Sequence, residues 1–367
     1  MITLPWPENA AEIPSPALLI DLAAVDRNLA RMLAIAGRPD RLRPHVKTHK
    51  LPQLIRRQLT LGITKFKCAT IAEAEMVADC GAPDVMLAGQ PVGPHVPRLL
   101  ALARRFPATR FSTMADDEGA IRELSRQAAA AGVVIDVFLD LDVGQHRTGI
   151  APGPRAAQLY RLISALPGLR TAGLHAYDGH IHDTDLATRI VACETAYEPV
   201  EALRAELVRA DLPVPRIVAG GTPTFPIHAL RGVECSPGTC VLWDAGYGTK
   251  MPDLLFEPAA LLFARVVSKP SATRLCLDLG HKAVAAEMPH PRVVFPLLPE
   301  ATPVVHSEEH LVIETPRASE FAVGDAFLGI PWHICPTVAL HAEVWILENG
   351  RASERWPVVA RARRLTI

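Results

Sequence analysis

The sequence predicts an α/β protein in two parts: an eight-stranded (β/α)8 barrel of the TIM type, followed by a mainly antiparallel β domain. Up to about Pro252, short β-rich runs alternate with longer helical patterns, and this alternation is typical of parallel βα units. After Pro252 the strand-like runs follow one another without helical patterns between them, which indicates antiparallel pairing. We therefore expect the barrel over residues 22–252 and the β domain over residues 253–367.

The runs with strand character in the first part each end near a polar, Gly or Pro cluster. They are Leu42–Lys47, Lys65–Ala69, Val85–Ala88, Arg110–Thr113, Val133–Asp142, Thr171–Tyr177, Arg216–Ala219 and Val233–Cys235. Helical patterns precede and separate these runs: Asp21–Ala36, Leu51–Leu59, Ile71–Cys80, Pro94–Arg105, Asp116–Ala131, Arg155–Leu166 and Leu186–Ala210. This number of strands, spread over roughly 220 residues, fits a closed barrel better than an open sheet.

The strand-like runs of the second part have turn signals between them in place of helices. They are Leu261–Val267, Arg274–Leu277, Arg292–Phe295, Leu311–Glu314, Ala339–Leu347 and Val358–Ala362. The sequence therefore predicts a separate antiparallel sheet of roughly 110 residues, a usual size for a domain.

Composition and charge exclude several classes of protein. The 38 Lys and Arg residues are balanced by 39 Asp and Glu residues, so the basic excess typical of nucleic-acid-binding proteins is missing. No run of about 18 apolar residues is long enough for a membrane span. The seven cysteines are odd in number and scattered, which favours reduced thiols in a cytoplasmic protein over a disulfide framework.

The carboxyl ends of barrel strands usually build the active site, and Lys47 lies at the end of the first predicted strand. An amine in that position is partly desolvated, which lowers its pKa and makes it a candidate for Schiff-base formation. The alternative is a solvated lysine at the start of the next helix. The sequence has only seven lysines among its 38 basic residues, and lysine can act as a nucleophile where arginine cannot.

Two glycine-rich turns follow the last two predicted barrel strands, at Gly220-Gly221-Thr222 and Gly238-Thr239. Barrels commonly bind a phosphate at this place, through backbone N–H groups that glycine leaves uncovered. Ordinary turn chemistry would also explain each turn taken alone. Two such turns on neighbouring strands favour the phosphate site.

The ends of the fifth and sixth predicted strands add residues suited to a flat, anionic ligand. Arg147 is a candidate for a fixed cation against a ring oxygen or carboxylate, and Tyr177 for a ring that stacks on the ligand. His180 and His182 follow Tyr177 and are candidates for metal binding or base catalysis. A surface arginine and a core tyrosine remain open as structural alternatives.

His333-Ile334-Cys335 is a candidate metal-binding motif in the β domain. Residues two apart in an extended segment point to the same side, so this interpretation predicts that the imidazole and the thiolate converge there. Two such ligands, completed by water and substrate, are typical of an open catalytic Zn²⁺ site, and the soft thiolate favours zinc over magnesium. The alternative is a chance pairing of a histidine with a buried cysteine.

Taken together, these segments resemble the D-threonine aldolase and D-serine dehydratase family, which belongs to the fold-type III pyridoxal-phosphate enzymes. The resemblance covers nearly the whole chain and lies in residues 15–21, 44–50, 142–149, 220–222, 331–337 and 356–361. The motif at 331–337 is informative because single-domain pyridoxal-phosphate carriers and alanine racemases lack it.

The resemblance implies a role for each candidate residue. Lys47 would form the Schiff base with pyridoxal phosphate, Arg147 would approach the phenolic oxygen of the cofactor, and Tyr177 would lie against or near its ring. The two glycine-rich turns would hold the phosphate. His333 and Cys335 would bind a divalent metal ion, zinc or manganese. The resemblance also implies that an N-terminal strand within residues 1–21 joins the β domain, and that the protein is a homodimer.

The implied activity is that of a lyase dependent on pyridoxal phosphate and a divalent metal, acting on D-3-hydroxy-α-amino acids. The first expectation is retro-aldol cleavage of D-threonine-type substrates to glycine and an aldehyde, with His180 or His182 removing the hydroxyl proton. The alternative is a dehydratase of D-serine or D-3-hydroxyaspartate, which yields a 2-keto acid and ammonia. Cys335 favours the dehydratase, because aldolase members tend to carry Asp there.

Two remoter alternatives are an amino-acid racemase and a non-catalytic pyridoxal-phosphate carrier. A racemase needs an acid or base on each face of Cα, yet all four tyrosines, at 160, 177, 197 and 247, precede the β domain. A carrier would need no metal ligands, so the His333/Cys335 motif argues against it.

Overall fold

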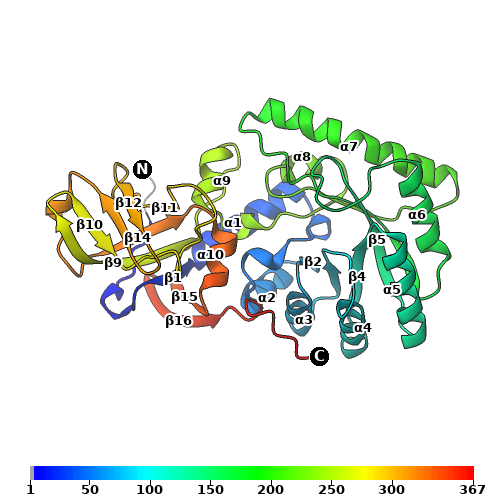
Figure 1. Cartoon of the computed structure of the whole chain (residues 1–367), viewed down its shortest axis with the longest axis horizontal. Helices are drawn as coiled ribbons and strands as arrows, with labels where there is room; N and C mark the ends of the chain where they lie inside the picture. The colour runs from blue at the N-terminus through cyan, green and yellow to red at the C-terminus, as the bar shows by residue number, and fades with distance from the viewer. Residues whose placement is uncertain (1–3) are drawn as a thin grey trace. The chain divides into compact units, whose positions relative to one another are not determined.

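The computed structural model describes residues 4–367, and these residues form two compact units. The first unit comprises the described N-terminal residues up to Arg31, together with Thr48–Leu51 and Thr239–Arg361; the second comprises Met32–Lys47, Pro52–Gly238 and Ala362–Ile367. The first unit contains a mainly antiparallel sheet, and the second contains a parallel sheet with helices (Figure 1). The predicted fold class is confirmed.

The parallel sheet holds seven strands within the described residues, paired in chain order from β2 to β8. They are β2 (Lys65–Cys68), β3 (Asp84–Leu87), β4 (Arg110–Ala115), β5 (Ile135–Leu141), β6 (Leu169–Ala176), β7 (Ile217–Ala219) and β8 (Glu234–Cys235). Helix α2 (Pro52–Thr60) precedes β2, and the helices between the strands are α3 (Ile71–Asp79), α4 (His95–Arg105), α5 (Glu118–Ala131), α6 (Pro154–Ala165), α7 (Leu186–Arg209) and α8 (Phe225–Ala229). Figure 1 shows α3, α4 and α5 side by side, in contact with one another along one flank of the sheet.

The first predicted barrel strand, Leu42–Lys47, is not a regular strand. Leu42 forms a single bridge to β8 and His45 a single bridge to β2, so this segment connects the two edges of the seven-stranded sheet. Pro44 lacks an N–H group and cannot donate to a ladder. From Val46 the chain turns into a 3-10 helix that contains Lys47.

The end of β2 is fixed by the start of α3, which follows after two residues. Thr70 caps the helix, because its hydroxyl accepts a hydrogen bond from the N–H of Glu73 at 3.2 Å. The Glu73 carboxylate in turn accepts from the N–H of Ala69 at 2.6 Å. This reciprocal capping box positions the last residues of β2, which include Lys67.

The interior of the parallel sheet has an apolar layer of buried residues: Met86, Met114, Phe138, Ala172 and Val218. Asp140 follows Phe138 by two positions along β5 and therefore points to the same face. Charged side chains thus lie next to the apolar layer, toward the carboxyl ends of the strands. The full burial of β5 is typical of a strand covered on both faces.

The first unit is built around a sheet ordered β12-β13-β10-β9-β1-β15-β16, with β14 also pairing with β9 and β11 pairing with β14. Its strands are β1 (Ala17–Asp21), β9 (Ala260–Ser271), β10 (Arg274–Leu277), β11 (Val293–Val294), β12 (Thr302–His306), β13 (Leu311–Glu314), β14 (Ala326–Pro331), β15 (Glu343–Glu348) and β16 (Arg351–Pro357). Its helices are α1 (Leu22–Ala36), which continues into the second unit, α9 (Ala245–Lys250) and α10 (Ile334–Leu340). The N-terminal strand β1 pairs in parallel with β15 and antiparallel with β9.

Two predicted strands of the β domain need correction. The expected strand at Val358–Ala362 is irregular, because the two-residue turn Asn349-Gly350 makes the chain return at once as β16 (Arg351–Pro357). Asn and Gly take positive φ angles of 50° and 79° here, as a tight hairpin turn requires. The expected strand at Ala339–Leu347 begins too early, because α10 occupies its first residues. Strands β12, β14 and β16 were not predicted.

Among residues 4–367, none of the helices combines the length and apolar character needed to cross a membrane. All seven cysteines lie within this range, and none of them forms a disulfide bond there.

Candidate active site

The second unit contains a cavity of about 490 Å³ at the carboxyl ends of β2 to β6, where the strand-end rule places an active site. Its charged and aromatic lining residues are His45, Lys47, Lys67, Asp116, Asp140, Asp142, Arg147, His175 and Tyr177. This volume is in the range of small-molecule sites, about 300 to 1,000 Å³. Lys47, Lys67 and Arg147 supply cationic groups for an anionic ligand, while three carboxylates line the same cavity.

Of the predicted cofactor-binding residues, Lys47, Arg147 and Tyr177 all line this cavity. The Arg147 guanidinium lies 5.3 Å from the centroid of the Tyr177 ring. The Tyr177 ring also packs tightly against two glycines: a Cβ atom would lie 2.3 Å from the ring at Gly179 and 3.0 Å at Gly221. Any side chain at Gly179 would displace the ring, so the backbone around it fixes the aromatic wall of the cavity.

A chain of buried polar groups that the sequence analysis missed also opens into the cavity. The Lys67 amine lies 2.7 Å from His175 Nε2, and His175 Nδ1 lies 2.6 Å from Asp140 Oδ1. Burial, together with the charge of Lys47, lowers the pKa of Lys67 to about 7, although Asp140 acts in the opposite direction. The available signal was an ionisable residue between two apolar neighbours on each of three strands: Lys67 in β2, Asp140 in β5 and His175 in β6.

The two glycine-rich turns are held together by hydrogen bonds within the protein. The N–H of Gly238 donates to Thr222 Oγ1 at 3.3 Å, and the N–H of Gly221 donates to Thr224 Oγ1 at 3.2 Å. Gly220 adopts a positive φ of 75°, and its N–H donates to a backbone carbonyl of β6. The expected uncovered N–H groups are therefore paired here, two of them with rotatable hydroxyl groups that a phosphate could replace.

The remaining residue of this predicted set, Thr239, belongs to the first unit. Its hydroxyl lies 3.5 Å from Cys335 Sγ. The structure therefore brings Thr239 to the predicted metal-binding motif.

Neither predicted catalytic histidine lines the cavity. His180 packs against Gly144, where a Cβ atom would lie 2.8 Å from His180 Nε2. Gly144 belongs to the loop after β5 that also carries Asp142 and Arg147. His182 is exposed, and its Nδ1 lies 2.6 Å from the carbonyl oxygen of His180. Of the two histidines, His180 is therefore the one that contacts a loop lining the cavity.

His333 and Cys335 lie together, but not on an extended segment as predicted. His333 precedes α10 as its N-cap residue, and Cys335 lies in the first turn of that helix. The carboxylate of Asp244 accepts the N–H of Ile334 at 3.1 Å and so supplies a hydrogen bond that the helix N-terminus lacks. Helical geometry therefore replaces strand geometry in bringing the two side chains together.

His333 and Cys335 each favour the charged form of the other. His333 Nδ1 lies 2.5 Å from Glu287 Oε1, and Cys335 Sγ lies 3.2 Å from the hydroxyl of Thr48. Burial disfavours the imidazolium, but the hydrogen bond and charge of Cys335, with Glu287, raise the pKa of His333 to about 9. Burial likewise opposes ionisation of Cys335, but the hydrogen bond and charge of His333 bring the pKa of the thiol below its usual value.

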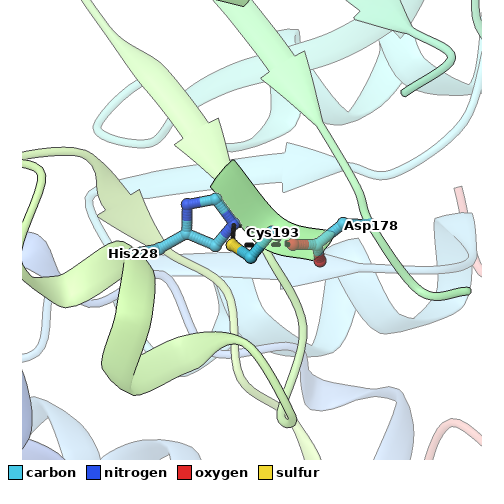
Figure 2. Close-up of side chains that lie close together, drawn as sticks. All are labelled: Asp178, Cys193 and His228. Carbon is cyan, nitrogen blue, oxygen red and sulfur yellow. Dashed lines mark hydrogen bonds and ion pairs between the residues drawn. The ribbon is translucent and has the colours of Figure 1, made fainter. Parts of the chain in front are cut away.

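A second group of metal-ligating side chains, which the sequence analysis did not predict, lies in the second unit (Figure 2). Asp178 follows β6, Cys193 lies on α7 and His228 on α8, and all three are buried. His228 Nε2 lies 2.8 Å from Asp178 Oδ2 and 3.4 Å from Cys193 Sγ. This donor set suggests a metal site, and its chemistry suits zinc.

Hydrogen bonds also link this group to its surroundings. Asp178 Oδ1 accepts from the Thr224 hydroxyl at 2.8 Å, in addition to the contact with His228. Burial and the charge of Asp178 raise the pKa of the Cys193 thiol to about 12. Because Thr224 also accepts the N–H of Gly221, the group is connected to the first glycine-rich turn.

Two known families match separate parts of the chain. The family described as "Alanine racemase, N-terminal domain" matches residues 20–244, and the family described as "Putative serine dehydratase domain" matches residues 259–347. The first match covers more than half of the chain.

Full-length relatives cover both parts. The chain is 32% identical to a D-threonine aldolase of an Arthrobacter species, over 98% of this chain and 97% of that protein. Its fold is similar to the crystal structure of D-threonine aldolase from Filomicrobium marinum, with a TM-score of 0.89, 32% identity and 99% of each chain covered.

The fold is also similar to D-threo-3-hydroxyaspartate dehydratase from Delftia sp. HT23, with a TM-score of 0.79, 24% identity, and 95% of this chain and 98% of that chain covered. Two further structures with this fold are variants of a D-threo-3-hydroxyaspartate dehydratase: a cysteine-to-alanine variant in the metal-free form and a histidine-to-alanine variant, with the two positions two residues apart.

Proposed function

Since the chain belongs to the alanine racemase-like, fold-type III family that contains the D-threonine aldolases and D-serine dehydratases, we propose that it cleaves D-threonine-type substrates to glycine and an aldehyde. The enzyme would depend on pyridoxal phosphate and a divalent metal ion. The observation that carries the proposal is the single cavity that Lys47 shares with Arg147 and Tyr177. The 32% identity to a D-threonine aldolase over nearly the whole chain supports the choice of reaction.

The residues of the cavity fit pyridoxal phosphate. Lys47 would hold the cofactor covalently through its amine, and Arg147 would bind an anionic ring oxygen. Tyr177, fixed by Gly179 and Gly221, would limit the position of the ring. The turns at Gly220, Gly221, Thr222, Gly238 and Thr239 would hold the phosphate. When bound, this cofactor supplies an electron sink for the bond that breaks at Cα.

His333 and Cys335 fit a divalent metal ion, zinc or manganese. The imidazole has a carboxylate partner in Glu287, which is the usual support of a metal-ligating histidine. The neighbouring imidazole lowers the pKa of the Cys335 thiol, which favours the thiolate that a metal needs. Their spacing of two residues also matches the two substituted positions of the dehydratase variants. When bound, the metal supplies Lewis-acid stabilisation to a substrate hydroxyl oxygen.

Proton transfer from the substrate hydroxyl group needs a base, and we assign this role to His180, with His182 as the alternative. His180 contacts the loop that carries Arg147, and its Nδ1 has no hydrogen-bond partner among the described residues. An imidazole nitrogen without a hydrogen-bond partner can act as the acceptor in proton transfer.

The protein would act as a homodimer in the cytoplasm, as the family resemblance and the reduced cysteines favour. A D-3-hydroxyaspartate or D-serine dehydratase is the second candidate function, and Cys335 is the observation that favours it. The thiol at this position sets the chain apart from the Asp that aldolase members tend to carry.

Product analysis separates the two functions. The purified protein, loaded with pyridoxal phosphate and with zinc or manganese, is incubated with D-threonine and with D-serine, and L-threonine serves as the stereochemical control. We expect glycine and acetaldehyde in equal amounts from D-threonine. Formation of a 2-keto acid and ammonia without glycine would contradict the aldolase and establish the dehydratase.

A further inference from the structure

Lys67, on β2, is the second lysine of the cavity, and neither the sequence analysis nor the proposed reaction uses it. Its side chain is 3% exposed, yet it lines the cavity together with Lys47. Among the described residues its amine has one hydrogen bond, to His175 Nε2 at 2.7 Å. An ammonium group has three N–H donors, so two remain for a ligand in the cavity.

Asp140 and His175 orient this amine. Asp140 Oδ1 lies 2.6 Å from His175 Nδ1 and assigns the ring proton to that nitrogen, which leaves Nε2 as the acceptor that faces Lys67. Burial, reinforced by the charge of Lys67, lowers the pKa of His175, so the ring is neutral near neutral pH. The carboxylate, the imidazole and the amine therefore form a directed chain that ends in the cavity.

The charged and polar groups around Lys67 lie on the segment from Arg43 to Lys47, on β5 and the loop after it, and on β6. The charge of Asp140 on β5 and the hydrogen bond to His175 on β6 stabilise the ammonium, whereas Lys47, Arg147 and Arg43 repel it. The Lys67 amine also lies 5.3 Å from the centroid of the Tyr177 ring, whose face attracts cations. Because attractive and repulsive charges compete at this buried amine, an anion that binds nearby shifts the amine to its charged form.

We propose that Lys67 is a second anion-binding group of the active site, which takes up a proton and binds an anionic oxygen of the ligand through its two open N–H donors. This inference rests on the proposed function, because the oxygen belongs either to pyridoxal phosphate or to the carboxylate of the amino acid. The Asp140–His175 pair positions the amine and stabilises its charged form. The proton comes from the solvent and is released when the ligand leaves.

A purely structural role for Lys67 does not explain its surroundings. If Lys67 only filled space in an apolar layer, a neutral side chain could replace it without loss of stability. The buried chain from Asp140 through His175 to the Lys67 amine would then have no function. Lys65, two residues earlier on the same strand, shows the structural case. Its amine binds Glu234 Oε1 at 2.6 Å and the carbonyl oxygen of Asp40 at 2.7 Å, away from the cavity.

The test is the number of protons taken up on binding, measured by isothermal titration calorimetry in buffers of different ionisation enthalpy. One arm titrates pyridoxal phosphate into the cofactor-free protein, and the other titrates glycine into the loaded protein. With a pKa of about 7, Lys67 takes up about half a proton at pH 7 when an anion fully stabilises its charge. We expect this uptake to disappear in Lys67→Met, with affinity reduced about tenfold or more in the same arm.

The variants separate anion binding from folding. Lys67→Arg keeps a permanent cation and is expected to retain affinity without the proton uptake. Lys65→Met is the matched control on the same strand and is expected to bind like the wild type, and thermal unfolding checks that each variant is folded. Loss of uptake in the pyridoxal phosphate arm assigns the oxygen to the cofactor, and loss in the glycine arm assigns it to the substrate carboxylate.

The outcomes also distinguish this inference from the proposed function. If folded Lys67→Met takes up as many protons as the wild type in both arms and binds as tightly, the role of Lys67 is overturned while the lyase stands. If the wild type does not bind pyridoxal phosphate at all, the proposed function fails, and the Lys67 inference fails with it.

Discussion

The two groups of metal-ligating side chains differ in how completely the protein itself satisfies them. Asp178, Cys193 and His228 are all buried, and the Asp178 carboxylate already accepts hydrogen bonds within the barrel unit. His333 is 40% exposed and rests against Glu287, with Cys335 beside it in the β-domain unit. We call Asp178, Cys193 and His228 the closed group, because burial closes it to substrate. We call His333 and Cys335 the open pair, because it has an exposed side.

This difference indicates which group is suited to catalysis. A structural metal site is closed by protein ligands, whereas a catalytic one keeps a position for water or substrate. The closed group also connects through Thr224 to the turn at Gly221, so its position serves the shape of the barrel. The open pair is therefore where a catalytic metal ion is expected.

The largest effect is expected from removing the thiol of the open pair. Cys335→Ala should lower kcat about 1,000-fold, since a Lewis acid contributes several kcal/mol at the reacting oxygen. The variant should also lose its bound metal, measured by elemental mass spectrometry after dialysis. Cys193→Ala is the comparison in the closed group and should retain the catalytic metal. Loss of metal from Cys193→Ala, with retention in Cys335→Ala, would assign the metal to the closed group instead.

The second effect concerns stability and is expected in the closed group. Asp178→Ala removes the acceptor of three buried hydrogen bonds, from Thr224, His228 and Cys193. At about 1 to 3 kcal/mol for each unsatisfied buried group, the free energy of unfolding should fall by about 3 kcal/mol. Urea denaturation measures this change. Asp183→Ala, at an exposed position in the same loop, should change it by less than about 0.5 kcal/mol.

The sequence was informative wherever a residue acts within its own segment. The alternation of strands and helices predicted the parallel sheet, because each βα unit carries its own local pattern. Lys47, Arg147 and Tyr177 could be placed in one cavity because parallel strands end on the same side. The pair His333 and Cys335 was found for a different reason: residues two apart stay close in a strand or at a helix start.

Residues that become neighbours only in the folded chain were not predicted from the sequence. Lys67, Asp140 and His175 lie on three different strands, and only the sheet register brings them together. Cys193 and His228 meet through the packing of α7 and α8 near the loop that follows β6, which no spacing in the sequence reveals. The strand β16 was missed for a local reason, because its alternation is weak and its residues are mostly exposed.

The smallest effect is expected from the partner of the open pair's imidazole, and it would sharpen the comparison most. Glu287→Gln keeps the shape of the side chain but replaces the carboxylate that lies 2.5 Å from His333 Nδ1 by a neutral amide. If His333 is a metal ligand, losing this support should weaken metal affinity about tenfold, because such carboxylates orient the ring and raise its basicity. Competition with a chelator measures the affinity. Glu309→Gln, in the same unit and 61% exposed, is the matched control and should bind as tightly as the wild type. Equal affinity in both variants would mean that Glu287 only balances a surface charge, and that His333 does not hold the metal ion.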